Sequence, residues 1–334
     1  MHCRLKHIQK KSYRMSKWSP ESWKDYTLNQ APGWINDNTL KNTIGQLRKN
    51  PPLVFKDEIK LLKSRLSRVH DGEYFIIQGG DCAETFSDFS SNLIKNKLNI
   101  LLQMSVLLSY TTSMKTIRIG RMAGQFAKPR TNSVEVVNNY EYPSYRGDAI
   151  NGLDCNIKSR TPNPERMIKA YNQSAFTLNL IRSMINSGHT SILNASQWDL
   201  DFINKSPQFE EYNDIIYKIQ KALSFIETVD RKSSSLDQIE LYEFFASHEG
   251  LILEYEQALT RYDANDKKYY DHSGHMIWVG DRTRSINGSH IEFVSGIENP
   301  IGIKLGPSIE CDELIEIIKK INPRNEKGKI ILIA

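Results

Sequence analysis

Apolar residues occur in short, separate runs from residue 73 onward, and each run has the length of one buried strand. The runs occupy residues 73–78, 115–119, 241–245, 276–279, 300–303 and 329–333. Between some of them apolar positions recur at helical spacing, as in residues 92–109 and from Asn163 to Gly188. Strands that alternate with helices predict right-handed βαβ units and a parallel sheet.

The pattern before these runs is polar and helical, from residue 15 to about residue 70. Ser19 suits the cap of a helix whose first turn contains Pro20. Further along, one helical face carries Ile59, Leu62 and Leu66. We expect residues 15–70 to form a helical arm that packs on residues 71–334.

Two features of residues 71–334 favour a barrel over a doubly wound sheet. No GxGxxG follows the first strand, so the dinucleotide-binding fingerprint is absent. Polar side chains instead follow the carboxyl ends of the strands, where (β/α)8 barrels hold their active sites. Only six of the eight strands of such a barrel are recognisable, and the sixth ends at Ala334. The pattern therefore predicts an incomplete (β/α)8 TIM barrel, truncated at its C-terminus.

Composition narrows the functional classes. The 334 residues carry 44 Lys and Arg against 39 Asp and Glu, a net charge of +5, without the basic and aromatic groove that nucleic-acid binding requires. No apolar run approaches the ~20 residues of a membrane span. Four separated cysteines without a CxxC pair indicate a reducing, cytoplasmic location. Residues 1–14 are basic and free of acids, which predicts an unstructured extension before Met15; a plastid transit peptide is the less favoured reading.

The first chemical motif is the strand end Gln78-Gly-Gly-Asp-Cys-Ala-Glu-Thr85. Its glycines allow a sharp turn that presents Cys82 to the barrel mouth. Flanked by Asp81 and Glu84, this thiol could be a metal ligand or a nucleophile, or a buried structural cysteine.

A second motif follows the next strand and contains four cations around Gly124. They are Arg118, Arg121, Lys128 and Arg130. Guanidinium groups match phosphate oxygens, and barrels commonly bind phosphate in such loops. A solvated basic loop is the other reading, but the apolar neighbours of these cations favour phosphate binding.

Four later motifs add charged groups, three of them at strand ends. Ser144 to Asp148 forms a loop that either holds substrate or is braced by an Arg146–Asp148 pair. His248 and Glu249 are candidates for acid–base chemistry, and His248 is as readily a hydrogen-bonded core residue. An inward-pointing Lys304 is costly unless it meets an anion. One anionic ligand shared by Arg121, Arg282 and Lys304 explains these cations better than three separate ion pairs do.

Several stretches together resemble the class II (plant-like) 3-deoxy-arabino-heptulosonate-7-phosphate (DAHP) synthases. They are WSPESWK, QGGDCAETF, RMAGQFAKPR, SYRGDAING, FFASHEGLILEYE, WVGDRTRSINGSHIEF, NPIGIKLGP and INPRNEKGKIILIA, in order from Trp18 to the last residue. The resemblance implies the condensation of phosphoenolpyruvate with erythrose-4-phosphate, the first step of the shikimate pathway of aromatic amino-acid biosynthesis. It also implies a divalent metal that polarises the aldehyde, with Mn²⁺ expected and Co²⁺ or Zn²⁺ as alternatives.

The resemblance assigns roles residue by residue. Cys82 matches the family's cysteine metal ligand. The phosphoenolpyruvate-binding positions are Arg121, Asp281, Arg282 and Lys304, of which Arg282 and Lys304 are also the expected catalytic residues. Lys128, Pro129 and Arg130 would serve the sugar phosphate, and Glu249 joins the substrate-binding set. Asp281 stands where many relatives have Glu, which keeps a carboxylate in place.

The family also has an Arg-Met-Gly turn and His, Glu and Asp metal ligands that would lie beyond Ala334. Because catalytic metal sites normally take three or more protein ligands, we expect the isolated chain to lack synthase activity. Uncovered apolar faces would make it poorly soluble, and the full-length protein is expected to be a homo-oligomer. Two alternatives are an inactive remnant that binds phosphate or pairs with an intact subunit, and another barrel aldolase that uses Lys304 as a Schiff base.

Overall fold

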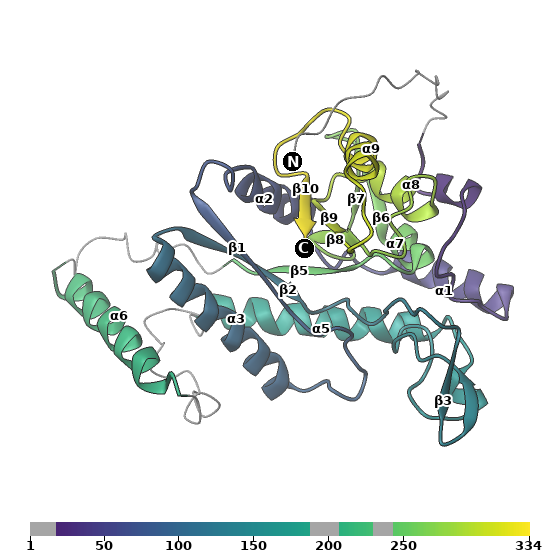
Figure 1. The fold of residues 1–334 in the computed structure, drawn as a ribbon, viewed down its shortest axis with the longest axis horizontal. Coiled ribbons are helices and arrows are strands. Elements are labelled where there is room, and N and C mark those ends of the chain that lie inside the picture. Colours follow the sequence, from purple (N-terminus) through teal and green to yellow (C-terminus); the bar gives the residue numbers. More distant parts are fainter. Residues whose placement is uncertain (1–17, 188–206, 230–242) are drawn as a thin grey trace.

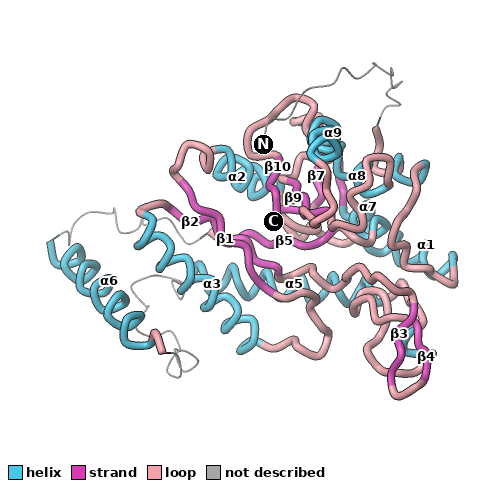
Figure 2. Tube along the Cα trace, viewed as in Figure 1, coloured by secondary structure: helices cyan, strands magenta, loops and turns pink. Residues whose placement is uncertain are grey.

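A curled, wholly parallel sheet of six strands forms the centre of the molecule in the computed structural model, which describes residues 18–187, 207–229 and 243–334. The strands follow one another across the sheet as β1 (Tyr74–Gly80), β2 (Lys115–Arg121), β5 (Phe245–Glu249), β8 (Met276–Val279), β9 (Ile301–Lys304) and β10 (Ile330–Ile333) (Figure 1). Figure 2 shows the strands in magenta. This order never reverses, so the sheet lacks the switch point of a doubly wound fold. The predicted parallel α/β sheet is confirmed, and its curl is that of part of a TIM-like barrel.

Helices and two short hairpins connect these strands. The helices are η1 (Ser22–Asp25), α1 (Asp37–Lys49), α2 (Lys56–Ser67), α3 (Ser91–Thr112), α4 (Ile157–Arg160), α5 (Arg166–Asn186), α6 (Phe209–Val229), α7 (Leu253–Leu259), α8 (Ser289–Ser295) and α9 (Cys311–Ile321). The hairpins are β3–β4 (Val134–Val137 and Tyr140–Pro143) and β6–β7 (Thr260–Asp263 and Lys268–Asp271). The long helix α3 packs on β1 and β2, and α5 packs against α3 (Figure 1).

The alternation of side chains along each strand separates an inner from an outer face. The inner face buries one apolar cluster, made of Tyr74, Ile117, Ile119, Phe245, Met276 and Trp278 together with Leu62 and Leu66 of α2. On the outer face, Ile301 and Ile303 of β9 pack with residues of α8 and α9. Because side chains alternate with a period of two, the same rule fixes which polar residues point inward.

The N-terminal helices pack closely on the sheet domain. The predicted apolar face of α2 is confirmed, since Ile59 and Leu62 are fully buried. Ser19 accepts the backbone N–H of Glu21 on its Oγ at 3.3 Å and that of Ser22 on its carbonyl at 3.0 Å, as a capping residue would, although the helix that follows is only the short η1, which begins at Ser22. Long-range contacts hold this segment in place: the indole N–H of Trp18 donates to the Glu292 carbonyl at 2.9 Å, and that of Trp23 to Gln257 at 3.0 Å.

The third strand of the sheet lies later than its apolar run predicts. The run at residues 241–245 was the expected strand, whereas β5 begins at Phe245, and residues 241 and 242 lie outside the described residues. The inward positions of β5 are Phe245, Ser247 and Glu249, of which only Phe245 is apolar. Because the strand ends in polar inward residues, the apolar run in the sequence does not mark its position. His248 and Glu249 belong to the strand instead of following it.

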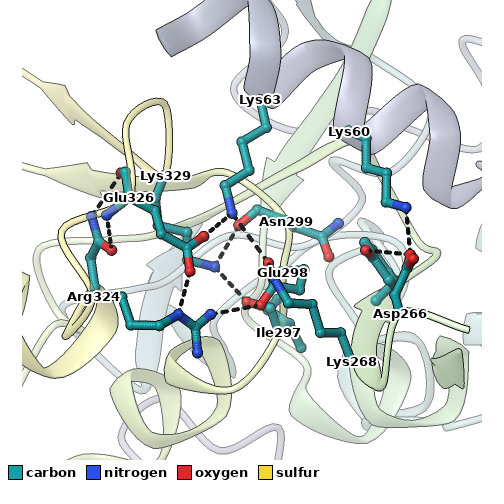
Figure 3. A network of polar contacts seen from close by, with 12 residues as sticks. Lys60, Lys63, Asp266, Lys268, Ile297, Glu298, Asn299, Arg324, Glu326 and Lys329 are labelled. Carbon is teal, nitrogen blue, oxygen red and sulfur yellow. Dashed lines mark hydrogen bonds and ion pairs between the residues drawn. The ribbon is translucent and has the colours of Figure 1, made fainter. Parts of the chain in front are cut away.

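A network of ion pairs joins α2 to the segments that flank β9 and β10 (Figure 3). Glu298 accepts from Lys268 at 2.9 Å, from Lys63 at 3.2 Å and from Arg324 at 3.1 Å. Behind it the buried Lys329 ammonium donates to the backbone carbonyls of Ile297 and Asn299, the second at 2.8 Å. Burial lowers the pKa of Lys329 to about 7.

This buried ammonium predicts that stability depends on pH. The unfolded chain, in which lysine has a pKa of about 10.4, binds more protons than the folded chain between pH ~7 and ~10. The contribution of Lys329 to the free energy of unfolding should therefore rise with pH across that window, by up to ~1.4 kcal/mol per unit. Urea unfolding of the unaltered chain and of Lys329→Met at pH 7, 8 and 9 measures this contribution. Lys327→Met, which removes an exposed lysine, is the control. A difference between the chain and Lys329→Met that is constant with pH would contradict the prediction.

Candidate active site

Three strands each carry a charged side chain as their last inward-facing residue, at the carboxyl edge of the sheet. Arg121 follows Ile117 and Ile119 on β2, Glu249 ends β5, and Lys304 ends β9. Gly302, one inward position before Lys304, lies against the Trp278 and Met276 side chains, which confirms the inward direction. The sequence of alternate positions thus brings two cations and one carboxylate to the same edge, where parallel α/β sheets bind their ligands.

Glu249 lies at the centre of this group; the residue is half-buried, and its Oε1 is fully buried. Its burial raises the pKa of the carboxyl to about 7, against the opposing effect of the cations of Lys304, Arg121 and Arg282, in that order. In the part of the chain that the structure describes, Oε1 of Glu249 and Nε of Arg121 are both buried without a hydrogen-bond partner. Buried polar atoms are normally paired, so these two indicate a place for a polar ligand.

Trp278 supports Arg121 and was not assigned a role from the sequence. The guanidinium carbon of Arg121 lies 4.9 Å from the centre of the Trp278 ring, which is the geometry of a cation–π contact. Trp278 lies two residues before Gly280 at the strand end, and the alternation of side chains along β8 turns it inward. That alternation is the feature of the sequence that indicates its role. The stacked ring limits the directions that the guanidinium can take.

Close approach of backbones shapes this edge. Gly80 pairs with Arg121 across β1 and β2 and has φ of 141°, and a Cβ there would lie 2.6 Å from the Arg121 carbonyl oxygen. Only glycine fits both conditions. The strand therefore continues through Gly79 and Gly80, instead of ending before them as predicted, and the turn comes at the following residues.

The cations of the motif that follows β2 do not all lie on the same side of the sheet. Arg118 lies on the outer face, where its Nε donates to Ser105 Oγ of α3 at 2.7 Å, so the expectation that it joins the cluster is wrong. The reason is the period of two, since Arg118 and Arg121 differ by an odd number of positions. Lys128 lies over the Tyr145 ring at 5.5 Å. Arg130 Nε donates to the Tyr145 carbonyl at 2.6 Å.

A polar cavity of about 390 Å³ adjoins these residues. Its lining includes Arg130, Thr131 and Arg146. Arg282 reaches this wall, because its Nη2 donates to Thr131 Oγ1. The predicted sugar-phosphate segment, which includes Pro129, is thereby connected to the predicted phosphoenolpyruvate group.

Asp281 and Lys304 differ from what their patterns suggested. Asp281 accepts from Arg284 at 2.9 Å, and Arg284 also pairs with Glu313 at 2.8 Å, so this carboxylate is held by a neighbour beside the cations. Lys304 points inward but is exposed, not buried, because it lies past the last buried layer of β9. An anion bound here would be attracted by the charge of Lys304. Because the ammonium is exposed to water, its charge does not require such a partner.

Two other polar motifs have structural partners. His248 is buried, and its Nε2 lies 3.0 Å from Glu256 Oε1, which makes it the hydrogen-bonded core residue of the two readings. Asp148 pairs with Arg166 at 3.0 Å, so the expected Arg146–Asp148 brace is replaced by a different one. Arg146 instead donates to the backbone carbonyls of Gln30 and Ala31.

Cys82 is exposed in the loop after β1. Lys128 lies near it, and burial together with the neighbouring Arg130 lowers the pKa of that lysine. The acidic neighbours of Cys82 are engaged elsewhere: Asp81 with Lys97, and Glu84 with backbone N–H groups. Among residues 18–187, 207–229 and 243–334, no three His, Cys, Asp or Glu side chains gather as a metal site. The described residues thus offer one candidate ligand and do not fit a complete divalent-metal site.

Comparison with known proteins gives the same family along the whole described chain. The profile of the class-II DAHP synthetase family matches residues 18–334. A phospho-2-dehydro-3-deoxyheptonate aldolase of Streptomyces coelicolor is 41% identical over 322 residues, which are 96% of this chain and 71% of that protein. A protein of the same name from Neurospora crassa is 38% identical over 331 residues, covering 95% of this chain and 68% of that protein. The chain belongs to the class-II DAHP synthetase family.

Proposed function

We propose that this protein is a DAHP synthase, which condenses phosphoenolpyruvate with erythrose-4-phosphate and releases inorganic phosphate. The observation that carries the proposal is the placement of Arg121, Glu249 and Lys304 at the carboxyl ends of the inward rows of three strands of one sheet. The cation of Arg282 also favours the ionised form of Glu249. An inactive remnant, the other reading of the sequence, receives no support from the relatives.

Phosphoenolpyruvate is a small, multiply charged anion, and the strand-end cations match it. Its phosphate and carboxylate would be shared by Arg121, Arg282 and Lys304, which come from three different strands and their loops. Arginine offers paired donors to either group, and lysine adds a point charge. The unpartnered Nε of Arg121 provides a donor that a ligand would satisfy.

The sugar phosphate fits the adjoining cavity. Arg130, Arg146 and Arg160 are the cations that line it. Lys128 lies two residues before Arg130, and Pro129 fixes the backbone between them. The hydrogen bond from Arg282 to Thr131 connects the two halves of the site. This arrangement would hold the aldehyde end of the sugar beside phosphoenolpyruvate, which lowers the entropy cost of forming the new bond.

Glu249 is the group suited to proton transfer. The reaction joins the methylene carbon of phosphoenolpyruvate to the aldehyde carbon, consumes one water and releases phosphate, and the former aldehyde oxygen gains a proton. A carboxyl whose pKa is about 7 holds or releases a proton near neutral pH, where side-chain acid–base catalysis is most effective. We assign this role to Glu249, with Arg282 and Lys304 stabilising the charge on the phosphate.

The family is generally metal-dependent, and a bound divalent ion would act on the aldehyde as a Lewis acid. Cys82 is the residue here that would contribute a ligand, and manganese, with cobalt or zinc as substitutes, is the metal that the resemblance predicts. Because the described residues supply no complete site, the roles above rest on protein side chains alone.

Further expectations concern the organisation of the protein. We propose a helical arm in residues 15–70, a catalytic domain in residues 71–334 and a homo-oligomer for the full-length protein. In the described part of the chain, no helix is long and apolar enough to cross a membrane. The proposed cytoplasmic location rests on the cysteine content.

Binding of phosphoenolpyruvate across pH tests the proposed site. Ionised Glu249 repels the ligand, so affinity should fall as pH rises from 6 to 8 through its pKa of about 7. Calorimetric titration of the unaltered chain should show this fall, and Glu249→Gln should retain only the part that comes from the ligand's own ionisation. A chain that does not bind phosphoenolpyruvate would refute the proposed function, and identical pH profiles would refute the role of Glu249.

A further inference from the structure

Glu84 occupies an unusual position between the first two loops of the proposed site. It lies in the loop after β1, two residues from Cys82, and is buried. Its carboxylate accepts three backbone hydrogen bonds from the turn after β2: Oε1 from Ala123 at 3.0 Å, and Oε2 from Gly124 at 2.9 Å and Gln125 at 2.8 Å. The backbone N–H of Glu84 in turn donates to the Gln125 carbonyl at 2.6 Å.

This carboxylate holds a turn that would otherwise be unfavourable. Ala123 has φ of 61°, in the left-handed region that non-glycine residues seldom adopt. Three successive N–H groups that converge on one point form an anion-binding nest, and the Glu84 side chain fills it. The turn begins two residues after Arg121, so its conformation sets the direction in which the end of β2 leaves the sheet.

The same turn also reaches the end of β5. The side-chain Oε1 of Gln125 accepts the backbone N–H of Glu249 at 2.9 Å, and its Nε2 donates to the Ala127 carbonyl at 2.8 Å. Gly124 lies close against the His248 ring, because a Cβ there would come within 2.6 Å of Nδ1. The turn thus contacts both His248 and Glu249.

We propose that Glu84 is a positioning residue, whose carboxylate fixes the turn of residues 123–125 and through it the placement of Arg121 relative to Glu249. This inference rests on the proposed function, since it concerns the phosphoenolpyruvate-binding geometry. Without the carboxylate, at least one buried N–H of the turn loses its acceptor, and the turn relaxes towards ordinary backbone angles. Arg121 and Glu249 then move apart.

The test compares phosphoenolpyruvate binding, by calorimetric titration from pH 6 to 8, in the unaltered chain and in Glu84→Gln. An amide has the shape of the carboxylate but only one acceptor oxygen, so the affinity should fall about tenfold. In addition, the pH midpoint that Glu249 sets should move upward, because Arg121 no longer favours its ionised form as strongly. The groups facing Glu249 from β2, β8 with its following loop, and β9 are Arg121, Trp278, Arg282 and Lys304.

Two further variants separate positioning from general stability. Glu254→Gln makes the same change in another buried carboxyl, one that accepts from the Trp34 indole at 3.3 Å and does not touch the site, and it should leave both affinity and midpoint unchanged. Gln125→Ala cuts the connection to Glu249 directly and should act like Glu84→Gln even where the latter folds poorly.

The outcomes are distinct. Unaltered affinity and midpoint in both Glu84→Gln and Gln125→Ala would overturn the inference, as would an equal change in Glu254→Gln. Failure of the unaltered chain to bind phosphoenolpyruvate would instead overturn the proposed function.

Discussion

Replacing Arg121 by alanine is expected to weaken phosphoenolpyruvate binding by at least about a hundredfold, because a half-buried guanidinium would be lost from an anion site. The side chain ends the inner row of β2, is held against the Trp278 ring at 4.9 Å, and has a buried Nε without a partner in the described structure. Arg121→Lys should recover part of the affinity, since it keeps the charge but loses the planar fork. Calorimetric titration at pH 7 measures the affinity for phosphoenolpyruvate in the unaltered chain, in Arg121→Ala and in Arg121→Lys.

Arg118→Ala is the matched control for this prediction. It removes the same type of side chain from the same strand, but from the outer face, where Arg118 donates to Ser105. We expect it to lower stability and to leave the affinity for phosphoenolpyruvate within about twofold, since it breaks a hydrogen bond remote from the ligand. Equal losses of affinity in Arg118→Ala and Arg121→Ala would contradict the assignment of the two faces.

Replacing Leu62 by alanine is expected to lower the free energy of unfolding by about 2–5 kcal/mol, the usual cost of a cavity at a buried leucine. Leu62 is fully buried where α2 packs on the inner face of the sheet, in the cluster that contains Ile117, Met276 and Trp278. Urea unfolding, followed by far-ultraviolet circular dichroism, gives the value.

The neighbouring Leu61→Ala supplies the control on the same helix. Leu61 is 39% exposed, so the same deletion should cost only about 1 kcal/mol or less. A loss for Leu62→Ala no larger than that for Leu61→Ala would show that α2 is not part of the inner core. The sheet would then not depend on the N-terminal helices for its stability.

Much of the site could be read from the chain because strands impose a simple rule. A period of two sends Arg121, Glu249 and Lys304 inward at the ends of their strands, and apolar runs locate five of the six strands closely. The same rule places Arg118, an odd number of positions from Arg121, on the outer face. The resemblance then connects these positions to one reaction, and the family comparison confirms the family.

Other features depend on contacts between distant parts of the chain. The packing of residues 18–25 depends on the distant acceptors of the Trp18 and Trp23 indoles. The bounds of β5 depend on a polar inner face that no apolar run shows. The pKa of Glu249 depends on burial and on cations from three other segments, so no local pattern contains it.

The sequence by itself determined the parallel α/β architecture, the order of the strands and the family, because hydrophobic periodicity and motif order are local properties of the chain. The tertiary structure alone decided that Glu249 lies among the cations of Arg121, Arg282 and Lys304, how Glu84 holds the turn after β2, and that burial raises the pKa of Glu249 to about 7. Those properties arise from desolvation and from hydrogen bonds such as the one between Gln125 and Glu249, 124 residues apart. Their strength depends on what surrounds each group in space.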